Sequence, residues 1–208
     1  MHPLLAPPFE RRVGEAVASI ERGTSAEVVV VVVRRSAAHT EFPLTAGLIA
    51  LATALTAVMF AEAELGDYLV YVAPLASFLA VFLLVRLVRP LLRLLLGARR
   101  RHRVTEILGR ATFQKAGLHR TRDATAVLVF LSLLEGDCAL IRDHGVVLAA
   151  GEDEWSALEA RFARALAARK PDDAVLEVLG ELGKVLTERL PPRPDDTDEL
   201  PSRVAVSF

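Results

Sequence analysis

The residues with the clearest capacity for chemistry lie close together after the middle of the chain. His144 follows Asp143 directly, and a carboxylate beside an imidazole is a combination used in general acid–base catalysis. Adjacent residues in a turn commonly point apart, so an ordinary turn explains the same pair. Cys138 is the only cysteine, and we expect it to be a buried, inert thiol. His102 lies within a run of arginines and is expected at the membrane interface.

The sequence contains no established catalytic motif around these residues. It has no G-x-S-x-G, no P-loop, no G-x-G-x-x-G after a strand and no H-E-x-x-H. A single cysteine also excludes a disulfide framework and a C-x-x-C metal site, and it suits a reducing compartment. The absence of a compact catalytic constellation counts against an enzyme.

Two long apolar blocks dominate the organisation of the chain. Residues 43–61 and 68–85 contain no Lys, Arg, Asp or Glu, and a short acidic break separates them. Each block is just long enough to cross a bilayer as a helix and too long for a strand. A buried hairpin in a soluble protein is the alternative. The composition, 52% hydrophobic and 25% charged with a mean hydropathy of +0.36, fits a membrane hairpin joined to a charged soluble part.

Arginines predict how this hairpin is oriented. Arg34 and Arg35 precede the first block, several arginines follow the second block, and the break between the blocks has no Lys or Arg. The positive-inside rule therefore predicts a multi-pass protein of the inner (plasma) membrane, with both termini and the soluble domain in the cytoplasm. Small residues recur on the first block and fit either close helix packing or alanine-rich filler: Gly47, Ala50, Ala54 and Ala57.

The stretch 86–103 is strongly basic and predicts a juxtamembrane helix along the membrane surface, with a kink at Pro90 and an interruption at Gly97. Such a block is typical of contact with anionic lipid headgroups. No aromatic or groove-reading residues are interleaved with its arginines, so we expect no nucleic-acid partner.

The remaining chain predicts an α/β fold. Six consecutive valines, residues 28–33, indicate a strand that is buried on both faces and pairs with a second strand at 124–132. A third strand is expected at 138–143 and a short further strand at the apolar run 146–149, and amphipathic helices are expected at 9–23, 104–118, 154–169 and 171–189. We predict an α/β sandwich, with a central sheet covered by helices on both faces, interrupted by the two-helix transmembrane hairpin. The predicted parts are 9–35 and 104–190 for the α/β domain, 43–85 for the hairpin, 86–103 for the basic helix and 191–208 for an acidic, proline-rich tail.

Several segments of this α/β part resemble one known family. Ser25-Ala26-Glu27-Val28-Val29-Val30 resembles the T-x-A-E-I/V-V-V-V first strand of the TPM domain family, which includes membrane-anchored bacterial proteins. The segment from Ala111 to Val129, the hairpin from Ser132 to Gly145 and the tail Asp198-Glu199-Leu200-Pro201 follow in the family's order. The chain departs from the family pattern at Asp123-Ala124, where the family has Asn-Gly.

The resemblance implies a fold and a possible site. In the TPM family, acidic side chains near strand ends form a cleft linked to divalent metal and to phosphatase activity. Here that role would fall on Asp123, Asp137 and Asp143, with Glu27 as an acid beside the first strand, and the ion would be calcium or magnesium. A solvated turn acid is the alternative explanation for each of them.

Two functions therefore remain open. The first is an interaction or accessory module, a TPM-like domain held at the cytoplasmic face, whose partners are the lipid bilayer and another membrane protein or assembly. The second is a divalent-metal-dependent phosphatase or hydrolase with an acidic cleft.

Overall fold

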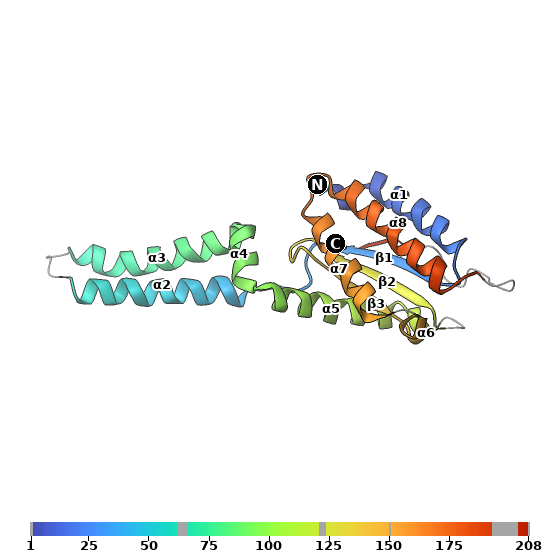
Figure 1. The fold of residues 1–208 in the computed structure, drawn as a ribbon. Helices are drawn as coiled ribbons and strands as arrows, with labels where there is room; N and C mark the ends of the chain where they lie inside the picture. Colours follow the sequence, from blue (N-terminus) through green and yellow to red (C-terminus); the bar gives the residue numbers. More distant parts are fainter. Residues whose placement is uncertain (1, 62–65, 121–123, 150, 193–203, 208) are drawn as a thin grey trace. The chain divides into compact units, whose positions relative to one another are not determined.

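The fold is mixed α/β and contains two compact units, seen in a computed structural model that describes residues 2–61, 66–120, 124–149, 151–192 and 204–207 (Figure 1). The α/β unit consists of Met1–Ser36 and Arg99–Phe208, and the helical unit consists of Ala37–Ala98. The helical unit is thus inserted into the sequence of the α/β unit.

A four-stranded sheet is built from the described strands of the α/β unit. Its order is β3-β2-β1-β4, in which β1 is Glu27–Val33, β2 is Ala126–Ser132, β3 is Asp137–Arg142 and β4 is Val204–Ser207. β1 runs parallel to both neighbours, whereas β2 and β3 form an antiparallel hairpin. The register sets Glu27 opposite Ala126, so the predicted pairing of the valine strand with the strand near 124–132 is confirmed.

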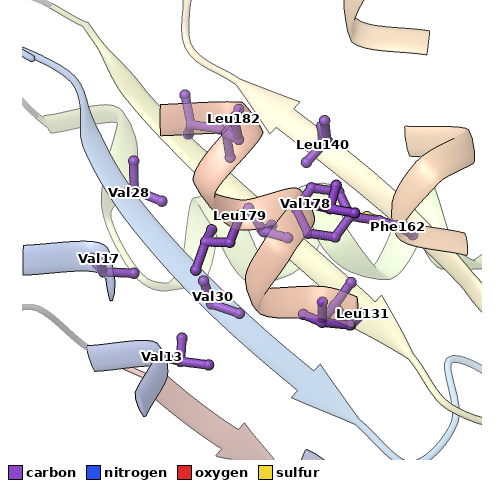
Figure 2. Packing of buried hydrophobic residues seen from close by; sticks show 14 of the residues in the cluster. Val13, Val17, Val28, Val30, Leu131, Leu140, Phe162, Val178, Leu179 and Leu182 are labelled. Carbon is purple, nitrogen blue, oxygen red and sulfur yellow. The ribbon is translucent and has the colours of Figure 1, made fainter. Parts of the chain in front are cut away.

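Both faces of this sheet are buried, as the unbroken valine run predicts. Val28, Val30 and Val32 enter one apolar cluster together with α1 (Pro7–Glu21) and α8 (Pro171–Arg189). Figure 2 shows side chains of both helices and of the strands interlocking in this cluster. Helix α7 (Glu152–Leu166) adds Trp155, Leu158 and Phe162 to the same cluster.

Helix α5 (Ala98–Lys115) packs on the opposite face of the sheet. Phe113 joins Val29, Val31 and Val33 in a second apolar cluster. Gly109 lies close to the sheet, since a Cβ there would come within 3.3 Å of Cγ1 of Ile141 on β3. Short 3-10 helices at Pro3–Leu5 and Leu118–Arg120 complete the α/β unit.

The helical unit contains α2 (Glu41–Met59), α3 (Asp67–Leu87) and α4 (Arg89–Leu96). Helices α2 and α3 pack along each other, and Gly47 lies at a point of closest approach, since a Cβ there would come within 2.9 Å of the Phe78 ring. The close-packing explanation therefore holds at Gly47. By length and composition, Glu41–Met59 and Tyr68–Leu87 could cross a membrane, and only 11% of each apolar window is buried.

Three expectations about the elements need correction. The basic stretch 86–103 is not one helix: Pro90 lacks a backbone N–H and starts α4, and Gly97, with φ of 64°, ends it. The short apolar run at 146–149 belongs to helix α6 (His144–Ala149), because the carbonyl of Asp143 accepts two amides and starts a turn. The tail 191–208 contains β4, which pairs with the edge of β1.

Candidate functional site at the carboxyl ends of β1 and β2

The acidic residues expected at a metal site are not brought together. Asp137 is the first residue of β3, and Asp143 directly follows its last residue, so a strand of about 20 Å separates them. Asp123 lies outside the described residues. Across the described ranges, no group of three or more His, Cys, Asp or Glu side chains could hold a metal ion.

Asp143 has a local structural role. Its Oδ1 accepts a hydrogen bond from the backbone N–H of His144 at 2.8 Å, and its own N–H donates to the carbonyl of Ala126 at 2.9 Å. The carboxylate oxygen thus bonds the amide of His144, at the start of α6. This is the behaviour expected of a turn acid.

Asp137 makes a different contact, with His102 on α5. Its Oδ2 lies 3.1 Å from Nδ1 of His102, the carboxylate side chain being 18% exposed and the imidazole 45% exposed. A carboxylate that orients an imidazole is a common part of acid–base sites. Here the pair joins β3 to the helix that follows the inserted unit.

Cys138 is next to Asp137 and is fully buried. Burial raises the pKa of the Cys138 thiol well above its usual value, and the negative charges of Glu159 and Asp137 raise it further. The thiol therefore stays protonated at neutral pH and is no nucleophile, as expected for an inert buried cysteine.

The residue that organises this region is one that the sequence reasoning did not single out as a site, Glu135. It lies in the turn between β2 and β3 and is fully buried. Its two carboxylate oxygens accept hydrogen bonds from the backbone N–H of Ser36 at 3.1 and 3.0 Å. The hydroxyl of Ser132, also fully buried, donates to the same carboxylate.

The backbone carbonyl of Glu135 binds the segment that follows the inserted helical unit. Arg101, on α5, donates from Nη1 to the carbonyl oxygen of Glu135 at 3.0 Å. Leu133 and Leu134 extend the ladder by donating to the carbonyls of Val33 and Arg34, each at 3.0 Å.

We call Ser36, Arg101, Ser132 and Glu135 the junction cluster. The chain leaves the α/β unit after Ser36 and returns to it at Arg99, so this cluster binds both flanks of the insertion to one turn of the sheet. It lies at the carboxyl ends of the parallel strands β1 and β2, where α/β folds often bind ligands. Here the carboxylate and hydroxyl are buried and bonded within the chain, so the arrangement holds backbone segments rather than a substrate.

The sequence did carry a weak signal for this cluster. Ser132 and Glu135 are three residues apart and precede Gly136, whose φ of 60° allows the tight turn. An acid in such a turn normally faces water. Glu135 is buried because the segments that contain Ser36 and Arg101 both pack against its turn, and their proximity is seen only in the folded chain.

A second acid, Glu159 on α7, protects the outer edge of the sheet. Its Oε1 accepts the backbone N–H of Leu140 on the edge strand β3 at 2.8 Å. Burial raises the pKa of Glu159 against the opposing effect of this hydrogen bond. The contact satisfies an edge amide that could otherwise pair with another strand.

A shallow groove between α1 and α8 is a further concave feature of the described α/β unit. It has a volume of about 470 Å³, and its lining includes Ile20, Leu176 and Gly180 together with Lys184 and Glu188. The lining is mostly apolar and offers one cation and one anion. It does not resemble a catalytic centre.

Comparison with known proteins supports the fold alone. No family model matches the chain, and no curated protein matches it. Among solved structures, the chain is similar to the NMR structure of BA42 protein from the psychrophilic bacterium Bizionia argentinensis, with a TM-score of 0.59 and 12% identity. The match covers 100% of this chain and 98% of that one. At this identity, the two proteins share a fold, and the likeness does not extend to activity.

Proposed function

We propose that this protein is a membrane-anchored interaction or accessory module, in which a TPM-like α/β sandwich is held at the cytoplasmic face of the inner membrane. The observation that carries the proposal is the exposure of its apolar helices. Ile49 on α2 is 62% exposed and Leu75 on α3 is 64% exposed, although both lie in the middle of apolar helices. Core helices of soluble proteins bury such residues, whereas lipid-facing helices present them outward.

The sandwich itself is supported by the two apolar clusters on opposite faces of the sheet. α1, α7 and α8 contribute to one cluster, and α5 contributes to the other. This layering agrees with the fold that the TPM resemblance implies. The charge pattern supports the cytoplasmic side, since arginines flank the helical pair at Arg34, Arg35 and Arg86 and none lies in the connection between α2 and α3.

No specific observation favours the metal-dependent hydrolase. Asp137 and Asp143 lie at opposite ends of β3, and Ser132 and Cys138 are fully buried. The proposal is therefore of an anchored module whose partner is another membrane protein or assembly.

Membrane insertion and orientation can be tested by cysteine labelling in intact cells. The native Cys138 is buried, so the unaltered chain gives the labelling background. Gly66→Cys, at the start of α3, should react with a membrane-impermeant maleimide added outside the cells. Ala18→Cys, exposed on α1, should react only after the membrane is permeabilised. The chain should also stay in the pellet after alkaline carbonate extraction.

Release into the carbonate supernatant would show that the helical pair does not span the bilayer. Labelling of Ala18→Cys from outside would reverse the orientation. A thermal-shift series with calcium, magnesium and manganese distinguishes the hydrolase. Because a ligand that binds only the folded state raises its stability by RT ln(1 + [L]/Kd), a specific metal site would raise the melting temperature at millimolar metal, whereas the anchored module predicts no change.

A further inference from the structure

Helix α4 presents an unusual surface for a segment next to a membrane span. Leu92 and Leu96 are buried and turned into the helical unit, where α4 contacts α2 and α3. Leu94 and Leu95, on the same short helix, are 77% and 44% exposed. The helix therefore has one apolar side that the protein covers and another that it leaves open.

The direction of α4 follows from the chain around Pro90. Helix α3 ends at Leu87, Val88 leaves the helical conformation with ψ of 88°, and Pro90 lies in the first turn of α4. Proline cannot continue the preceding helix, so the chain changes direction here. Figure 1 shows α4 crossing the end of the α2–α3 pair instead of extending it. If α2 and α3 span the bilayer, α4 runs along the plane of its surface.

The charged residues from Tyr68 to the start of α5 are all basic, although α4 also contacts α2, which begins with Glu41. No Asp or Glu occurs from Tyr68 to Thr105, whereas Arg86, Arg89 and Arg93 lie within or beside α4. Arginine pairs with phosphate oxygens and attracts anionic lipid surfaces at close range. An interfacial helix is expected to combine such cations with apolar side chains that enter the acyl boundary.

We propose that α4 is an interfacial helix that lies in the cytoplasmic headgroup layer, inserts Leu94 and Leu95 below it and selects anionic lipid through Arg86 and Arg93. The occupant of the open apolar side is thus the bilayer itself. The continuity of α4 with a candidate membrane span and the arginines beside its exposed leucines favour lipid over a protein partner. This inference rests on the proposed membrane anchoring and adds a lipid preference to it.

The test uses the full chain in lipid vesicles with an environment-sensitive bimane label at one added cysteine. Leu94→Cys reports on α4, Leu75→Cys on the middle of α3, and Ala18→Cys on the exposed side of α1. In one set of vesicles, a nitroxide group is attached near the headgroup of either phosphatidylglycerol or phosphatidylcholine. In a second set of vesicles, the nitroxide group is attached deep in the acyl chain. The unaltered chain gives the labelling background of Cys138.

The expected result is strong quenching of the Leu94 label by shallow nitroxide, several-fold greater from phosphatidylglycerol than from phosphatidylcholine at equal mole fraction. Because the two arginines supply the attraction to anionic headgroups, Arg86→Gln with Arg93→Gln should bring that ratio toward one. The Leu75 label should respond to deep nitroxide, and the Ala18 label to neither.

The outcomes separate the two proposals. If the Leu75 label is quenched but the Leu94 label responds no more than the Ala18 label, the interfacial helix is refuted and the anchoring stands. Equal quenching by both lipids refutes the anionic preference. A Leu94 label protected from lipid and aqueous quenchers alike shows a contact between copies of the chain, which also refutes it. If the Leu75 label is not quenched, the anchoring itself fails.

Discussion

Replacing Glu135 by alanine should destabilise the α/β unit far more than a typical substitution in a hairpin turn. The change removes the acceptor of the half-buried Ser36 amide and of the fully buried Ser132 hydroxyl. A donor left without its acceptor inside the protein costs about 1–3 kcal/mol, so two donors give about 2–6 kcal/mol. Removing the buried carboxylate also removes its desolvation cost, which offsets part of this loss. We expect the free energy of unfolding to fall by about 3 kcal/mol.

Fluorescence of Trp155 provides the assay, because it is the only tryptophan and is buried in the α/β unit. A loss of 3 kcal/mol should lower the melting temperature by roughly 10 °C for a domain of this size. Hydrogen exchange should show faster exchange at the amides of Ser36 and Leu134, while the amides within β2 keep most of their protection.

Ser36→Ala is the matched control. Ser36 donates through its backbone, which alanine retains, and its own hydroxyl oxygen is buried with no partner among the described residues. The control should therefore change stability by less than about 0.5 kcal/mol or raise it slightly. Equal effects of Ser36→Ala and Glu135→Ala would refute the role assigned to the carboxylate, as would unchanged exchange at Ser36.

Three further changes test other contacts. Gly183→Leu should destabilise by about 1–3 kcal/mol, because a Cβ at 183 would lie 2.7 Å from Ile20, whereas Gly180→Leu, with open space around it, should not; urea unfolding compares them. Glu159→Gln keeps a side-chain oxygen that can accept the backbone N–H of Leu140. It removes a carboxyl group whose pKa is raised by burial. As pH rises through the raised pKa of Glu159, the melting temperature of the wild type should therefore fall relative to that of Glu159→Gln. A wild type that instead gains melting temperature relative to the variant over this pH range would contradict the burial argument. Replacing residues 37–98 by a short Gly/Ser linker should give a soluble chain that folds with a native Trp155 signal, and aggregation of that chain alone would argue against an independent α/β unit.

The features of the fold that the sequence predicted are those that depend on long, regular patterns. Six consecutive valines can form neither an amphipathic helix nor a half-exposed strand, so burial on both faces and pairing with a distant apolar strand followed directly. The helix Pro171–Arg189 was equally clear from its apolar spacing and its first-turn acids. Both inferences rest on forces within one element or between two.

The errors lie where short segments take their structure from neighbours. The run at 146–149 is too short to distinguish helix from strand, and the turn at Asp143 decides it. The strand Val204–Ser207 follows an acidic, proline-rich segment that predicted no packing, yet the free edge of β1 supplies its partner. In each case, the deciding contact is not encoded in the segment itself.

The candidate site shows the same limit more sharply. Acids at strand ends were grouped through a family resemblance, but an acid at each end of one strand cannot share a site unless the strand is very short, and β3 has six residues. Glu135 had no such resemblance to mark it and lies between segments about a hundred residues apart in sequence. Its position follows from topology, since it needs both the β1–β2 pairing and the return of the chain at α5.

That topology also bears on why the insertion is tolerated at all. A long insertion between β1 and α5 would separate two segments that the sheet needs side by side, and loop-closure entropy grows only slowly with its length. The remaining requirement is that the segments before and after the insertion be held against the sheet while the ends of β1 and β2 stay covered. A buried carboxylate that accepts the outgoing Ser36 amide, with its carbonyl held by the returning Arg101, meets this requirement with one residue. The edge where many α/β proteins bind ligands is then occupied by the chain's own hydrogen bonds.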